Sequence, residues 1–131
     1  MEGTLLRERD IRKEWGWIRH LFEKIRIDGG YDWKTEDVYA ACLSKDATLL
    51  ISDDFLSIVV CHLMECLFTG EQFLFVWLAS GEGYAQKEHM PQLIDLAQRA
   101  GASFIRMETH RKGFERIPGW TKRHTTYDWR L

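Results

Sequence analysis

Glu108 and His110 lie two positions apart and carry side chains of the kinds that enzymes use as general bases. They follow segment 103–107, which is predicted to be a strand. Active sites in open α/β sheets collect at the carboxyl ends of strands, and imidazole titrates near neutral pH. We therefore predict Glu108 and His110 as candidate catalytic residues. The alternative is a capping or surface pair beside Arg106 and Arg111.

A loop with two glycines, Gly81 and Gly83, follows the apolar segment 73–79. Backbone N–H groups in such a loop, together with the N-terminus of a following helix, attract anions, and glycine lets the backbone approach them closely. The residues predicted to bind a phosphate group are Leu78, Ala79, Ser80, Gly81, Glu82, Gly83, Tyr84 and Ala85. The alternative is an ordinary tight turn from strand to helix.

The sequence has no Gly-x-Ser-x-Gly elbow, no P-loop and no recognisable Ser/His/Asp or Cys/His set. Cys61, His62 and Cys66 do not have the spacing of zinc ligands, so we predict no metal site. His62 is predicted to be a core histidine. Cys42 and the other two cysteines fall in apolar stretches, which is typical of reduced core residues in a cytoplasmic protein.

The formal net charge of −2 argues against nucleic acid as a partner of the whole chain. Residues 106–131 nevertheless carry seven Lys or Arg residues against three acidic ones. This basic segment could meet phosphates, be a solvated surface, or track a nucleic-acid strand with Trp120, Tyr127 and Trp129. No apolar run is long enough to span a membrane, and the N-terminus is too charged for a signal peptide.

Apolar spacing and turn residues predict one domain, 1–131, in which helices alternate with strands. A first helix follows the N-cap candidate Asp10, and its apolar stripe should bury Trp15 and Phe22. Thr35 is predicted to cap a second helix, and Gly101 to close a third. A short helix is predicted over 110–117, and the predicted strands are 1–8, 48–52, 55–63, 73–79, 103–107 and 127–131.

The connections between these strands predict an α/β (α+β) fold with a mixed sheet. Strands 48–52, 55–63 and 73–79 are joined by short turns, which makes them antiparallel. A helix connects 73–79 to 103–107, and such a crossover makes the two strands parallel. Helices are therefore expected on both faces of the sheet.

This order of elements resembles the GNAT acyltransferases over essentially the whole chain. Two segments carry the resemblance, the loop 78–85 and Phe114-Glu115-Arg116-Ile117-Pro118-Gly119-Trp120. The overall pattern is most similar to small divergent GNAT-like proteins of tailed bacteriophages. The resemblance implies an N-acyltransferase that holds acetyl-CoA where strands 73–79 and 103–107 splay apart, with the pyrophosphate on the loop. The acceptor would be a primary amine of a small molecule or a protein.

Three positions depart from the family pattern. Leu78 or Ser80, depending on the alignment, replaces a Gln or Arg of the family's loop. Glu115 occupies the position of the Tyr that usually acts as the family's general acid. Pro91 suits only the first turn of a helix, so the third helix is predicted to begin near Glu88.

These departures favour an alternative function, in which the domain has lost catalysis. It would then serve as a phage structural or host-interaction protein with a protein partner. Aromatic residues of the N-terminal part could form the contact surface, or pack under the sheet. They are Trp15, Trp17, Tyr31 and Trp33.

Overall fold

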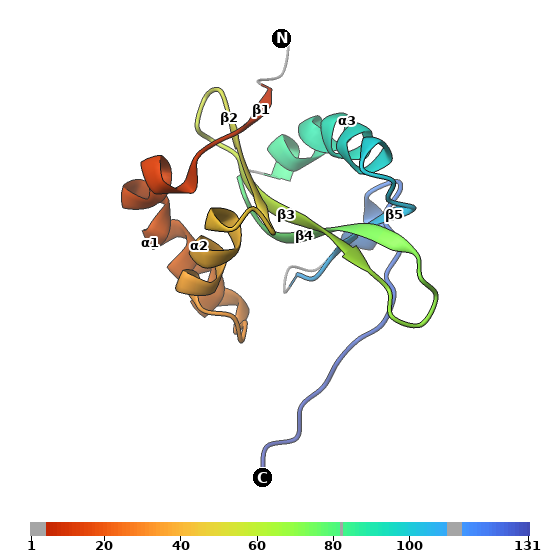
Figure 1. Ribbon diagram of the computed structural model, residues 1–131. Coiled ribbons are helices and arrows are strands. Elements are labelled where there is room, and N and C mark those ends of the chain that lie inside the picture. Colours follow the sequence, from red (N-terminus) through yellow and green to blue (C-terminus); the bar gives the residue numbers. More distant parts are fainter. Residues whose placement is uncertain (1–4, 82, 110–113) are drawn as a thin grey trace.

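The computed structural model describes residues 5–81, 83–109 and 114–131, which contain one five-stranded sheet between helices (Figure 1). The strands lie side by side in sequence order: β1 (Leu6–Glu8), β2 (Thr48–Ser52), β3 (Ile58–Glu65), β4 (Gln72–Ser80) and β5 (Phe104–Met107). The first four strands are antiparallel, and β4 and β5 are parallel. Helices α1 (Ile11–Gly29) and α2 (Thr35–Leu43) cover one face, and α3 (Gly83–Arg99) covers the other. The predicted mixed sheet with helices on both faces is confirmed.

Helix α1 forms as predicted because both ends are capped and one face is apolar. The Asp10 carboxylate accepts a hydrogen bond from the Arg12 N–H, and Gly30 ends the helix with a φ of 63°, which favours glycine. Phe22 is fully buried. Trp15 is half-buried rather than largely buried, because it packs against Tyr39 of α2 at the edge of the core.

The prediction that Thr35 caps α2 is wrong. Lys34 is the N-cap residue, and its backbone N–H donates to the Asp37 carboxylate at 2.8 Å. The Thr35 hydroxyl instead donates to the Glu23 carboxylate of α1 at 2.5 Å. Thr35 therefore joins the two helices, a role that depends on how α1 lies against α2.

Strand β3 begins at Ile58 and not at Phe55 as predicted. Phe55 has a φ of 61°, which is incompatible with a strand. The Ser52 hydroxyl donates to Asp54 at 2.6 Å and accepts from the Ser57 N–H at 2.9 Å. These side-chain bonds stabilise a turn in place of the first part of the predicted strand.

Helix α3 begins at Gly83 rather than near Glu88, and Pro91 lies inside the helix. An internal proline removes one backbone hydrogen bond and strains the preceding turn. Burial of Leu93 and Ala97 against the sheet offsets that cost. The loop between β4 and α3 is consequently short.

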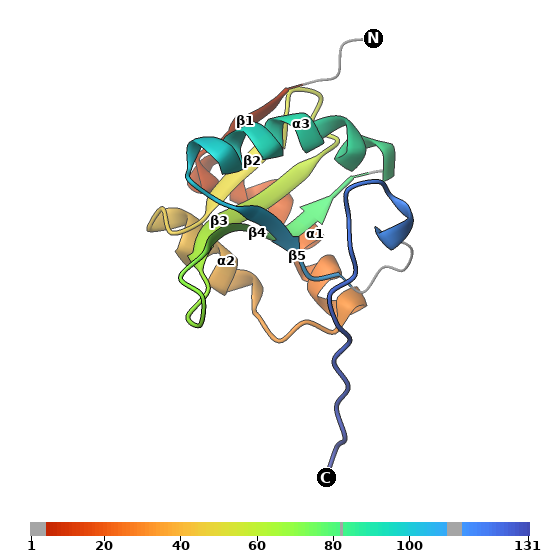
Figure 2. The same cartoon turned by 90° about the vertical axis from the view of Figure 1, so that its right-hand side faces the viewer.

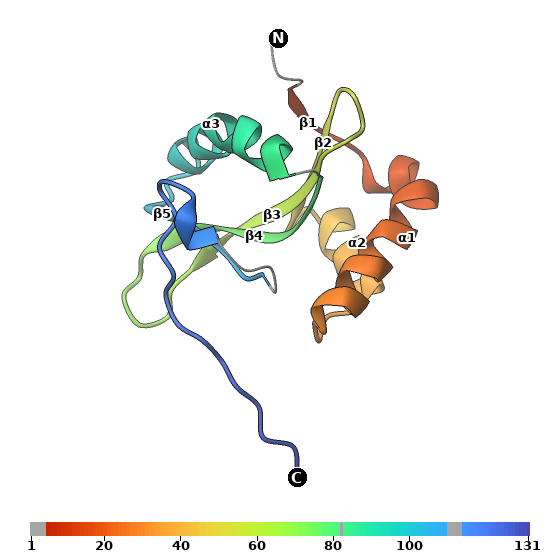
Figure 3. The same ribbon diagram turned by 180° about the vertical axis from the view of Figure 1, so that it is seen from behind.

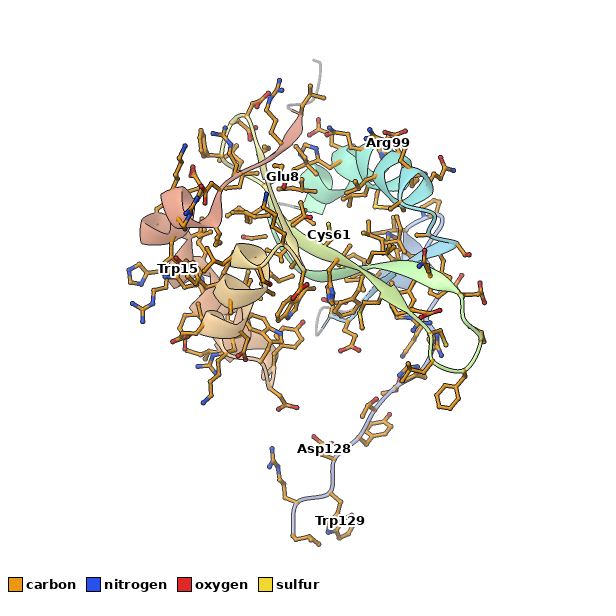
Figure 4. All side chains as sticks on the ribbon, in the orientation of Figure 1. Glu8, Trp15, Cys61, Arg99, Asp128 and Trp129 are labelled. Atoms are coloured by element: carbon orange, nitrogen blue, oxygen red, sulfur yellow. The ribbon has the colours of Figure 1, made fainter. Side chains whose placement is uncertain are left out.

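The predicted C-terminal strand 127–131 is absent. Residues 121–131 have no regular structure and leave the domain on the β5 side (Figures 2 and 3). The side chains of Tyr127 and Trp129 are 89% and 90% exposed, and Figure 4 shows Trp129 clear of the helices and the sheet. An alternating pattern forms a strand only where a sheet edge pairs with it, and no described strand pairs with the outer edge of β5.

In the described part of the predicted short helix over 110–117, Phe114–Arg116 form a single 3-10 turn, η1. Residues 110–113 lie outside the described residues. The two apolar cores lie on opposite faces of the sheet, one under α1 and α2 and the other under α3. None of the helices in the described part of the chain is long and apolar enough to cross a membrane.

Candidate functional site

Strands β4 and β5 separate partway along their length. They pair from Phe73 with Phe104 to Val76 with Met107, and the described residues contain no later pair. On its other side β4 carries a bulge, because Val60 and Cys61 of β3 face Leu78 and Val76. Trp77 is the extra residue.

A β-bulge bends its strand and increases the local twist. The bulge at Trp77 comes directly after the last residue of β4 that pairs with β5. Beyond the bulge, residues 78–80 continue to pair with β3, and residues 77–80 have no described partner on the β5 side. The bulge therefore accounts for the gap between the two strands and leaves an open edge of β4 beside it.

One cavity opens into this gap from the side of α1, and we call it the α1-side cavity. Its volume is about 100 Å³. The lining combines two carboxylates with aromatic and apolar groups, and the described lining residues include no Lys, Arg or His. They are Ile25, Asp28, Tyr31, Trp77, Leu78, Ala79, Met107, Glu108, Thr109 and Phe114.

A second cavity opens from the opposite face, and we call it the α3-side cavity. Its volume is about 40 Å³. The lining is apolar except for His89, which is 2% exposed. The other lining residues are Val59, Val76, Ala79, Met90, Leu93, Met107, Phe114, Ile117 and Trp120.

The two cavities share three lining residues, Ala79, Met107 and Phe114. Two of these flank the gap, because Ala79 lies on β4 beyond the bulge and Met107 ends β5. The cavities therefore approach one another through the space between the strands. Such an arrangement suits two molecules that enter from opposite faces and meet in the middle.

Of the two predicted catalytic residues, Glu108 follows β5 directly and lines the α1-side cavity. His110 lies outside the described residues. Sequence reasoning missed Asp28 and His89, and it named Tyr31 only as part of a possible contact surface. A carboxylate just before the Gly29-Gly30 helix stop was the only available signal for Asp28, and nothing local indicated which strand it would face.

The predicted phosphate-binding segment forms the end of β4 and the start of α3. The Leu78 side chain is buried in the core, so only its backbone could meet a ligand. Ala79 and Ser80 end the strand, and Gly81 has a φ of 148°, a conformation that favours glycine.

Glu82 lies outside the described residues, as do the side chains of Tyr84 and Ala85. The backbone of residues 83–85 forms the first turn of α3. Its unpaired N–H groups and the helix dipole therefore lie close to the end of β4.

The remaining candidates for chemistry lie elsewhere. His62 is half-buried between Phe75 and Trp77, and burial lowers its pKa. Burial raises the pKa of Cys42 to about 11 and that of Cys61 to about 12. Among the described residues no group of three or more His, Cys, Asp or Glu side chains could hold a metal ion.

No protein-family model and no curated protein matches this chain. Solved structures match over nearly its whole length. A predicted acetyltransferase from Clostridium acetobutylicum, solved with acetyl-CoA, has a TM-score of 0.70 at 10% identity, over 97% of this chain and 96% of that one.

Two further solved structures also match nearly the whole chain. Ribosomal-protein-alanine N-acetyltransferase from Brucella melitensis has a TM-score of 0.67 at 13% identity, over 98% and 99% of the two chains. A GNAT family acetyltransferase from Staphylococcus aureus has a TM-score of 0.62 at 14% identity, over 98% and 99%. The chain has the fold of the GNAT acetyltransferases.

Proposed function

We propose that this protein is an N-acyltransferase that binds acetyl-CoA at the gap between β4 and β5 and acetylates a primary amine. The observation that carries the proposal is the pair of cavities that approach the gap from opposite faces of the sheet. Direct acyl transfer requires an acyl donor and an amine to meet with their reacting atoms in contact. The fold, which is that of the GNAT acetyltransferases, supports the same function.

The residues around the gap are suited to the acyl donor. The open edge of β4 at residues 77–80 offers backbone N–H and C=O groups to the amides of the pantetheine arm. Gly81 and the start of α3 offer further N–H groups to the pyrophosphate, and the basic C-terminal segment can attract the remaining phosphate. Without a Gln or Arg in the loop, the affinity should be modest.

Acetyl-CoA supplies an acyl group activated as a thioester. The neutral amine nitrogen attacks the thioester carbonyl, a C–N bond forms, the C–S bond breaks, and CoA leaves as a thiolate that takes up a proton from water. Glu108 lines the α1-side cavity and would accept the amine proton directly or through one water. No residue is assigned as the acid, and a CoA thiolate can leave without one.

Calorimetry with acetyl-CoA and with free CoA, followed by an assay of thiol release with simple amines, tests the proposal. We expect micromolar to millimolar binding and slow, amine-dependent release of the thiol. Absence of acetyl-CoA binding would refute it.

The three cysteines are unpaired, which fits a reducing compartment such as the cytoplasm, where acetyl-CoA is available.

A second candidate function is a binding module without catalysis, for instance in a phage particle or against a host protein. The observation in its favour is the exposure of Tyr127, Trp129 and Leu131 on the C-terminal segment. Large exposed aromatic groups are typical interface anchors. Trp15 and Trp33 do not serve this purpose, because they pack against the core under α1 and α2. The same calorimetry separates the two functions.

A further inference from the structure

We infer that the α1-side cavity selects a primary ammonium group at the end of a slim, unbranched alkyl chain. The inference rests on the proposed function, because it assigns the acceptor half of the same site. Three properties of the cavity carry it: its charge, its aromatic wall and its volume.

The charge of the lining favours a cation. Asp28 comes from the end of α1 and Glu108 from the end of β5, so the two carboxylates reach the cavity from different elements. No described Lys or Arg forms a salt bridge with either of them. Both residues are exposed, so a protonated amine that enters the cavity would replace water beside the two carboxylates. One carboxylate could hold the amine while the other accepts its proton.

The aromatic wall favours the same ligand. Trp77 lines the cavity at the bulge, and its ring is held by Trp33 at 6.1 Å and by His62 at 5.7 Å between centroids. Tyr31 lines the cavity from the α1 side and stacks on Trp33. The face of an indole or phenol ring attracts a cation, and its apolar surface packs against methylene groups.

The volume favours slim acceptors. The cavity of about 100 Å³ is smaller than an apolar cavity of roughly 150 Å³ that binds benzene. A single alkyl chain with a terminal ammonium therefore fits this volume better than a ring or a chain that branches next to the nitrogen. The same chemistry is available from a free aliphatic amine or from a lysine side chain.

The test is an NMR titration of the protein, without acetyl-CoA, with three probes. They are butylamine, its uncharged analogue 1-butanol, and the bulkier cyclohexylamine. We expect butylamine to shift the Trp77 and Asp28 signals with at least about tenfold higher affinity than either other probe. Equal affinity for butylamine and 1-butanol, or preference for cyclohexylamine, would overturn the inference.

Substitutions locate the effect. Asp28→Asn should weaken butylamine binding about tenfold and leave 1-butanol unchanged. Asp32→Asn, the matched control, removes the same charge four residues away at a position that does not line the cavity. An equal loss in both variants would show that only general charge attraction is at work, and the inference would fail.

A parallel titration with Nα-acetyl-lysine amide distinguishes the two sources of the amine. Binding of butylamine alone assigns the cavity to free amines, and binding of both probes extends it to lysine side chains. Calorimetry with acetyl-CoA is independent of these titrations. Loss of acetyl-CoA binding with butylamine selectivity intact would therefore refute the acyltransferase function, whereas the reverse result would refute only the acceptor class.

Discussion

Val76 of β4 and Met107 of β5 form the last pair between the two strands. The next residue of β4 is the bulged Trp77, and the next residue after β5 is Glu108. Both of these side chains line the α1-side cavity. A single point of strand separation therefore places the aromatic wall and the candidate base of the site opposite one another.

Replacing Glu108 with Gln should reduce the turnover of acetyl-CoA with an amine by about 10²–10⁴-fold, because the substitution keeps the shape and removes the proton acceptor. Acetyl-CoA affinity should not change. Glu65→Gln, at the exposed end of β3 and outside both cavities, is the control. If both variants turn over at the wild-type rate, the base is another residue.

Replacing Gly81 with Val should lower acetyl-CoA affinity in calorimetry, since a side chain is strained at its φ of 148°. Gly101→Val is the matched control. It also introduces a side chain at a positive φ, 83°, but beyond the other end of α3. Comparable losses of affinity in the two variants would mean that strain on α3, and not the loop, is responsible.

Gly83 offers a separate test of close approach. Gly83 is the first residue of α3 and needs no positive φ. Gly83→Val should therefore weaken acetyl-CoA binding only if the pyrophosphate approaches the backbone there. Unchanged affinity would restrict the phosphate site to Gly81 and the strand end.

Phe22→Ala should reduce the free energy of unfolding by about 3–5 kcal/mol, because Phe22 is fully buried under the sheet. Trp15→Ala should cost less, since Trp15 is half-buried and loses mainly its contacts with Phe22 and Tyr39. Trp129→Ala removes a ring that is 90% exposed and should leave stability unchanged. Urea denaturation measures the loss in free energy of unfolding for each variant. A loss that does not decrease from Phe22→Ala through Trp15→Ala to Trp129→Ala would contradict this account.

Acid should destabilise the contact between α1 and α2. Hydrogen bonds from Arg26 and then from Thr35 lower the pKa of Glu23 from 4.5 to about 2. A carboxyl group with a lowered folded-state pKa contributes stability that is fully present above 4.5 and is lost as the pH falls toward 2.

The substitution Thr35→Val should raise the pKa of Glu23, as measured by an NMR titration of its side-chain carboxyl. It should also move the onset of acid unfolding to higher pH. Thr35→Ser keeps the hydroxyl donor and is the control. An unchanged titration of Glu23 in Thr35→Val would show that the hydroxyl does not stabilise the carboxylate.

Cys66 should react with a thiol reagent before the other two cysteines at neutral pH. Hydrogen bonds from the Thr69 side chain, and from the backbone of Thr69 and Phe68, lower its pKa, whereas burial raises that of Cys42 and Cys61. Mass spectrometry after brief alkylation should find one modified thiol. Cys66→Ser should abolish the fast phase, and a fast phase that persists would contradict this assignment.

Features that depend on neighbouring residues in the chain could be predicted from the sequence. Asp10, Gly30 and the apolar stripe of α1 act within one helix, so the sequence by itself determined where α1 lies and which face it buries. The relative directions of strands β2 to β5 followed from their connections. Glu108 was found as a candidate because it directly follows a strand.

Features that depend on distant segments were decided only by the tertiary structure. Thr35 does not cap α2 as predicted, because its hydroxyl donates a hydrogen bond to the Glu23 carboxylate of α1. The pattern at 127–131 forms no strand, because an alternating segment requires a sheet edge as partner, and no described strand pairs with it.

The candidate site is also a feature that depends on distant segments of the chain. Asp28 and Glu108 lie far apart in the sequence, and no local pattern relates them. They line one cavity because the register of β4 against β3 produces the bulge at Trp77 and ends the pairing with β5. Register is a property of paired strands, so the sequence determined the elements, and only their packing decided which residues meet.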